Sequence, residues 1–116
     1  MPDIAAMIPL CHTSDIADNQ ARGFVIAGSS LFVVRREDGI YVYRNSCPHL
    51  GVELNWVPDQ FLDRDGTLIM CSTHGALFEI ETGDCIAGPC AGDALEEIPH
   101  QVVDGMILIA PPLPRT

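Results

Sequence analysis

The sequence predicts an antiparallel all-β protein, a small sandwich or a partly open barrel, with one loop-rich excursion from the strands. Short runs of β-branched and aromatic residues are separated by Asp-Gly or Thr-Gly dipeptides, which favour tight turns. Ile40 and Val42 alternate with Tyr41 and Tyr43 at the period of a strand. No segment shows an apolar stripe at helical spacing, and only residues 93–98 could form one helical turn. These observations indicate strands joined by hairpins rather than helices.

Two strand pairs are expected from the same pattern, in which runs of apolar and aromatic residues flank an Asp-Gly dipeptide. They are residues 31–36 with 40–45 around Asp38-Gly39, and residues 100–103 with 106–110 around Asp104-Gly105. Two further short strands are expected within residues 67–70, after Asp65-Gly66, and 76–81, before Thr82-Gly83.

The length of 116 residues is that of one domain. Within it, residues 45–92 interrupt the strand rhythm and hold four of the five cysteines. We interpret this stretch as an excursion from the β framework, with strands before and after it closing the base. Residues 1–44 and 93–116 would then form the base.

The net charge of −10 comes from sixteen acidic and six basic residues, and all six basic residues are arginine. An acidic chain excludes nucleic acid and anionic membranes as partners, and it suits a basic protein partner. No apolar run approaches the about 18 residues of a membrane span, and the first residues do not read as a signal peptide. With an odd number of cysteines, this pattern predicts a cytoplasmic protein.

Two pairs of potential metal ligands stand in loops rich in glycine and proline. Cys47 and His49 are separated by one residue, Cys71 and His74 by two, and twenty-one residues lie between the pairs. Two thiolates and two imidazoles suit a tetrahedral zinc ion or a [2Fe-2S] cluster. The glycines favour the cluster, since its sulfides need backbone N–H donors at close approach. A catalytic Cys71–His74 dyad would leave the first pair without a role.

Both ligand motifs and several later positions form one pattern: Cys47-Pro48-His49-Leu50-Gly51, Cys71-Ser72-Thr73-His74-Gly75, Phe78, Thr82-Gly83 and Gly88-Pro89. This pattern resembles the Rieske-type ferredoxin family, in its soluble form that serves multicomponent oxygenases, and the resemblance extends from about Phe24 to Ile109. It implies a [2Fe-2S] cofactor and a Rieske-like fold, in which a cluster-binding subdomain, here about residues 45–92, is inserted into an antiparallel β-sandwich base. One iron would be bound by Cys47 and Cys71 and the other by His49 and His74, with Gly88-Pro89 covering the cluster.

The resemblance also implies a function. The chain would be a one-electron carrier, not itself an enzyme, between a flavin-dependent reductase and a terminal oxygenase, and both would dock where the histidines reach the surface. One alternative is a small Rieske subunit of a larger oxidoreductase. Another is a zinc-stabilised interaction module without a redox function.

Four positions depart from the Rieske proteins of respiratory complexes. Val52 and Thr73 stand about where those proteins carry a disulfide, and Ala76 and Phe78 stand where they carry a serine and a tyrosine that donate to cluster sulfur. Fewer donors stabilise the reduced cluster less. We therefore expect a potential toward the low end of the Rieske range of about −150 to +300 mV.

The remaining notable residues are expected to be structural. Cys85 and Cys90 would be unbonded small side chains near the cluster, and Trp56 and Phe61 would belong to the core. Cys11-His12 would serve packing or surface, and His100 would be solvated beside a strand.

Overall fold

The computed structural model describes residues 7–26, 28–37, 39–48, 53–55, 59–72 and 75–110. In these ranges the regular elements are strands, apart from one 3-10 turn, η2 (Thr13–Asp15). The strands are β1 (Ile8–His12), β2 (Gln20–Ile26), β3 (Ser29–Arg36), β4 (Gly39–Arg44), β5 (Leu68–Met70), β6 (Leu77–Glu79), β7 (Cys85–Ala87), β8 (His100–Val103) and β9 (Met106–Ile109). The prediction of an antiparallel all-β fold is confirmed.

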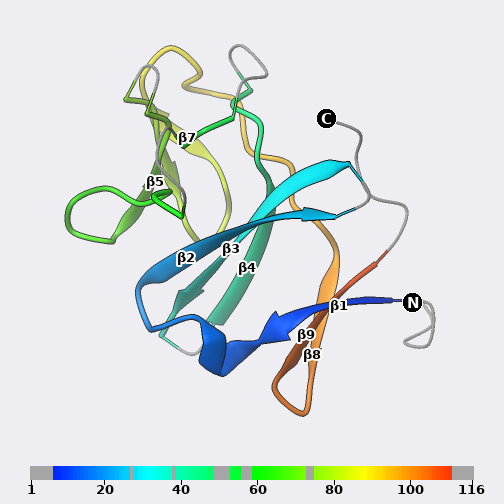
Figure 1. Ribbon diagram of the computed structural model, residues 1–116. Coiled ribbons are helices and arrows are strands. Elements are labelled where there is room, and N and C mark those ends of the chain that lie inside the picture. The colour runs from blue at the N-terminus through cyan, green and yellow to red at the C-terminus, as the bar shows by residue number, and fades with distance from the viewer. Residues whose placement is uncertain are drawn as a thin grey trace.

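The strands form three antiparallel sheets in the orders β2-β3-β4, β1-β9-β8 and β5-β6-β7. In Figure 1 the β2-β3-β4 sheet lies at the centre, with β5 and β7 on one side and β1, β8 and β9 on the other. The first two sheets are the sandwich base. The β5-β6-β7 sheet, called here the β5–β7 unit, belongs to the stretch expected as an insertion, and the exact boundaries 45–92 stay a prediction.

Strand β3 explains how one sheet supports two cores. Its side chains from Ser29 to Val34 are all buried, and successive residues point to opposite faces. Leu31 and Val33 join the core shared with β1 and β9. Phe32 and Val34 join the core shared with the β5–β7 unit. Because β3 is covered on both faces, its sequence is continuously apolar rather than alternating.

The predicted turns are largely confirmed. In the β8–β9 hairpin Val103 pairs with Met106, and Asp104 and Gly105 have φ values of 51° and 80°, as a type I′ turn requires. The other hairpin differs by one residue. Arg36 pairs with Gly39, so the turn residues are 37 and 38 and Gly39 already belongs to β4. Glu37 has a positive φ of 50°, so a residue other than glycine takes the left-handed conformation at this turn.

The helical turn considered for residues 93–98 is absent. Ala94 and Glu97 instead form isolated bridges with Asp84 and Tyr43, and the Arg44 N–H donates to the Glu96 carbonyl. The segment is therefore extended, because pairing with β4 and with the start of β7 offers its backbone more partners than one helical turn. Among the described residues, no helix is long and apolar enough to cross a membrane.

Candidate metal centre

The two predicted cysteine ligands lie at the ends of strands that belong to different sheets. Cys47 follows β4 and Cys71 follows β5, both side chains are 0% exposed, and both belong to one buried cluster. His49 and His74 lie outside the described residues. In the ranges that the structure describes, no three His, Cys, Asp or Glu side chains form a group able to hold a metal ion. The structure thus places two of the four predicted ligands in one buried cluster, and their role as ligands stays a prediction.

Asn45 organises the first ligand loop. Its buried side chain accepts the Leu54 N–H at 2.8 Å and donates to Asn55 Oδ1 at 3.0 Å, while its own N–H donates to the Ser30 carbonyl at 2.9 Å. The start and the end of the loop are therefore held together beside β3. Sequence reasoning missed Asn45, because nothing local distinguishes it from an ordinary asparagine at a strand end.

The second ligand loop closes on itself and on the first. The Cys71 N–H donates to the Ala76 carbonyl at 2.9 Å, and the Gly75 N–H donates to the Cys71 carbonyl at 2.8 Å. Gly75 has a φ of 68°, which a glycine adopts without strain. The Ser72 N–H donates to the Leu54 carbonyl at 2.7 Å. This last bond joins the two ligand loops directly.

A third loop, residues 88–93, lies against the second. Gly88 has a φ of 102°, and a Cβ atom there would stand 2.8 Å from the Cα of Ala76. Such close approach of two backbones requires glycine. Gly88 thus lies beside the second ligand loop, as expected. That Gly88-Pro89 covers the cluster stays a prediction.

Four buried cysteines gather in this region, and none of the five in the chain is disulfide-bonded. Cys85 Sγ and Cys90 Sγ are 2.9 Å apart, and Cys85 Sγ also lies 3.3 Å from the Ala87 carbonyl. Burial, followed by contacts with the thiols of Cys85 and Cys47, raises the pKa of Cys90 to about 12. Cys90 therefore stands between Cys85 and the predicted ligand Cys47 as a neutral thiol.

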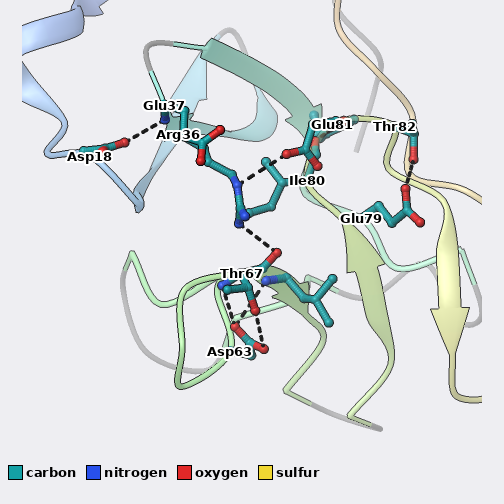
Figure 2. A network of polar contacts seen from close by, with 11 residues as sticks. Asp18, Arg36, Glu37, Asp63, Thr67, Glu79, Ile80, Glu81 and Thr82 are labelled. Carbon is teal, nitrogen blue, oxygen red and sulfur yellow. Dashed lines mark hydrogen bonds and ion pairs between the residues drawn. The ribbon is translucent and has the colours of Figure 1, made fainter.

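Two side chains of the base reach across to the β5–β7 unit. The buried hydroxyl of Tyr43 donates to the Ile80 carbonyl at 2.6 Å. Arg36 donates to the Thr67 carbonyl at 3.1 Å and lies 3.4 Å from a Glu81 carboxylate oxygen. Figure 2 shows Arg36 between these partners, one on each side of its guanidinium group. These contacts hold the unit in place from its outer end, away from the ligand loops.

Most of the other predicted side-chain roles are confirmed where the structure describes them. Phe61 is in the core and stacks on Phe32 with ring centroids 4.4 Å apart. Cys11 is buried, and exposed His12 caps η2 through Ser14. The prediction for His100 was wrong in part: its ring is half-buried and its nitrogens lie 3.1 and 3.0 Å from the carbonyls of residues 98 and 40.

Trp56, Val52 and Thr73 lie outside the described residues, so the expectations for them stay predictions. Ala76 and Phe78 are both 0% exposed and carry no hydroxyl group.

The donor set fits an iron–sulfur cluster. Two fully buried thiols come from two loops that a backbone hydrogen bond joins, and thiolates of this kind are the ligands of one iron in a Rieske centre. Glycine in the second loop allows the backbone approach that cluster sulfides require.

Comparison with known proteins points the same way. Residues 6–103 match the family model described as Rieske [2Fe-2S] domain. A curated relative, cholesterol 7-desaturase of Caenorhabditis elegans, is 32% identical over 81 residues, which make up 69% of this chain and 18% of that protein. The chain thus spans less than a fifth of that relative's length.

Two solved structures are similar over their whole length. The ferredoxin of Sphingomonas yanoikuyae B1 is 27% identical, with 91% of this chain and 99% of that chain covered and a TM-score of 0.72. A chain in the complex of reduced oxygenase and oxidized ferredoxin of carbazole 1,9a-dioxygenase is 25% identical, with coverages of 96% and 98% and a TM-score of 0.75.

Proposed function

We propose that this chain, which belongs to the Rieske [2Fe-2S] domain family, carries single electrons from a flavin-dependent reductase to a terminal oxygenase. As a Rieske domain it binds a [2Fe-2S] cluster. The observation that carries the proposal is the pair of buried thiols, Cys47 and Cys71, on two loops joined by the Ser72–Leu54 hydrogen bond.

Each predicted ligand would have one role. Cys47 and Cys71 would bind the inner iron, and His49 and His74, which lie outside the described residues, would bind the outer one. When bound, the cluster takes up and releases one electron at a potential set by its charge, hydrogen bonds and exposure. The protein excludes water from the thiolate side, since both cysteine side chains are 0% exposed. A backbone hydrogen bond joins the two loops that carry these cysteines.

The cluster surroundings support a low reduction potential. Ala76 and Phe78 occupy buried positions beside the second ligand loop without offering an O–H donor. Donors to cluster sulfur favour the more negative, reduced state, so their absence lowers the potential. A low-potential carrier suits the delivery of electrons to an oxygenase.

Partner proteins would dock over the histidines. The net charge of −10 favours approach of a basic partner by long-range attraction. An apolar surface is available beside the third loop, where Ile86 is 50% exposed and Ala87 and Pro89 are exposed as well. The likeness to a ferredoxin found with its oxygenase supports an oxygenase as one partner. The absence of disulfide bonds among the five cysteines suits the reducing cytoplasm.

A second candidate is a Rieske unit that works within a larger oxidoreductase. The similarity to cholesterol 7-desaturase, of which this chain spans 18%, favours it. In that case the chain would stay bound to one partner and would not shuttle between two.

The cofactor is tested by iron and acid-labile sulfide analysis, together with electron paramagnetic resonance of the dithionite-reduced protein. The wild type and Cys11→Ser should bind iron and sulfide in equal amounts and give the rhombic signal of a Rieske centre. Cys47→Ser, His49→Ala, Cys71→Ser and His74→Ala should lose that signal. A protein that binds one zinc ion and remains colourless after iron–sulfur reconstitution contradicts the electron-transfer proposal.

The carrier role is tested by stopped-flow oxidation of the reduced protein by a terminal oxygenase, at increasing ionic strength. A shuttling carrier should react in a second-order step that slows as salt rises. Co-purification with one large oxidoreductase, at constant stoichiometry, would favour the second candidate.

A further inference from the structure

Cys85 and Cys90 are not needed as ligands in the proposed cluster site, yet they are buried in contact with each other. Cys85 opens β7 and Cys90 lies in the third loop. Their exposed fractions are 6% and 1%, and their sulfur atoms are 2.9 Å apart. That separation is closer than the van der Waals contact of two sulfur atoms, so an S–S bond requires only a small further approach.

The backbone holds this pair together independently of the side-chain rotamers. The Cys85 N–H donates to the Asp93 carbonyl at 2.9 Å, and the Asp93 N–H donates to the Cys90 carbonyl at 2.9 Å. The backbone of Asp93 thus forms hydrogen bonds with the backbones of both cysteines. Within the loop, the Ala91 N–H donates to the Gly88 carbonyl at 3.2 Å, which closes the turn.

We propose that Cys85 and Cys90 are a redox-active dithiol, which hydrogen peroxide converts into a disulfide beside the proposed cluster ligand Cys47. The two residues lie five positions apart, so the bond closes a small ring that includes Gly88-Pro89. The sequence alone had favoured two inert thiols. Their contact across the loop, which only the fold creates, is the reason for the change.

The oxidation balances in two steps. Cys85, the more exposed of the two, attacks one peroxide oxygen through Sγ; the O–O bond breaks, one water leaves and a sulfenic acid forms. Cys90 Sγ then attacks the Cys85 sulfur while its thiol proton passes to the departing hydroxyl; the S–O bond breaks, a second water leaves and the S–S bond forms. Two thiols and one peroxide give one disulfide and two waters. Exchange with a dithiol reductant restores both thiols.

The location suggests what the dithiol protects, and this part rests on the proposed function. Cys90 contacts Cys47, and Gly88 lies against Ala76 in the second ligand loop. Cys85 is 6% exposed whereas Cys47 is 0% exposed, so peroxide in solvent reaches Cys85 more readily than the ligand thiolate. The dithiol therefore consumes the oxidant, and the ring closed by the disulfide fixes the third loop against the second ligand loop.

The test is disulfide mapping of the cluster-loaded protein after treatment with hydrogen peroxide. Denaturation in the presence of an alkylating reagent is followed by cleavage before aspartate, which yields residues 84–92 as a peptide that contains only Cys85 and Cys90. Cys47 and Cys71 fall in the separate peptides 38–58 and 65–83. Peptide 84–92 should be unalkylated and lighter by two hydrogen atoms, and a dithiol reductant should restore alkylation of both cysteines. Cys47 and Cys71 should be alkylated throughout.

Three results would overturn the proposal. These are two alkylated cysteines in peptide 84–92 after treatment, sulfinic acids there without a disulfide, and a cross-link between peptides 84–92 and 38–58. The mapping does not depend on the cluster. A disulfide in a protein that binds no iron would contradict the proposed function and support the dithiol. Iron binding without a disulfide would support the proposed function and contradict the dithiol.

Loss of cluster absorbance under peroxide provides a second readout. Cys85→Ser should bleach severalfold faster than the wild type, whereas Cys11→Ser, a buried cysteine in the other core, should bleach at the wild-type rate. Equal bleaching of all three proteins would show that the dithiol does not protect the cluster.

Discussion

The β2-β3-β4 sheet of the sandwich base and the β5–β7 unit are both antiparallel sheets of three strands, but they are held in different ways. In the base, β2, β3 and β4 have seven, eight and six residues and form uninterrupted ladders. In the unit, β5, β6 and β7 have three residues each, and the β6–β7 ladder contains an irregularity. Strands this short supply few backbone hydrogen bonds of their own.

The unit therefore depends on contacts that come from elsewhere. The hydroxyl of Tyr43 and the guanidinium of Arg36 reach it from the base, and Asn45 and Ser72 tie the ligand loops. The cluster would add its own bonds to both loops. A stable sandwich base can therefore carry a metal-binding unit of low intrinsic stability, which a few polar contacts and the metal hold in place.

The largest expected effect is that of cluster removal, which should separate the two regions. When iron is chelated, amide protons of β5, β6 and β7 should lose hydrogen-exchange protection, whereas those of β2, β3 and β4 should keep most of it. The reason is that the ladders of the base do not include the ligand loops. Equal loss of protection in both regions would show that the two fold as one unit. Hydrogen exchange read by mass spectrometry makes the measurement.

The Gly88→Ala substitution should have the second largest effect. Its φ of 102° and a Cβ atom 2.8 Å from the Ala76 Cα should together lower the free energy of unfolding by about 3 kcal/mol and weaken cluster retention. Gly28→Ala is the matched control: its φ is 82° but nothing lies within 4 Å of the added atom, so only about 1 kcal/mol should be lost. Urea denaturation measures both, and equal losses would contradict the close approach of the two loops.

Tyr43→Phe removes one contact between base and unit. The Ile80 carbonyl loses its donor, which should cost about 1 to 3 kcal/mol in the free energy of unfolding. Tyr41→Phe is the control, because the Tyr41 hydroxyl makes no hydrogen bond within the described part of the chain and its ring is only half-buried. Similar losses in the two variants would show that the hydrogen bond contributes little.

Tyr43 also predicts a dependence on alkaline pH. Burial, and then the neighbouring Glu97, raise the pKa of its hydroxyl above the ordinary value of 10.0. The unfolded chain therefore ionises first, and the stability that the neutral hydroxyl contributes is lost as the pH rises above 10.0. The stability of Tyr43→Phe should fall less steeply with pH in that range. Parallel slopes for variant and wild type would contradict the raised pKa.

The smallest expected effect is that of Arg36→Gln. Its ion pair with Glu81 is partly exposed, so the loss should be about 0.5 kcal/mol and should shrink at high salt. The exposed Arg64→Gln is the control and should change stability less. A loss as large as that of Tyr43→Phe would mean that the bond to the Thr67 carbonyl is stronger than its geometry indicates.

Much of the base was predictable because its signals are local. The alternation of Ile40 to Tyr43 and the Asp104-Gly105 turn depend on residues a few positions apart, and the structure agrees with both. The ligand pairs Cys47/His49 and Cys71/His74 were recognisable for the same reason, although the structure describes only the cysteines. The one-residue shift at Gly39 shows the limit of such signals: Glu37 tolerates a positive φ when the strands on both sides fix the register.

The period of the strands, the approximate position of the turns and the spacing of the ligands were predictable from the sequence, since each follows from neighbouring side chains. Only the tertiary structure decided that Asn45 would tie the first ligand loop, that Tyr43 would reach residue 80 and that Cys85 would meet Cys90. These contacts depend on how the loops and sheets pack against one another. Burial then selects partners for polar groups that no local pattern can specify.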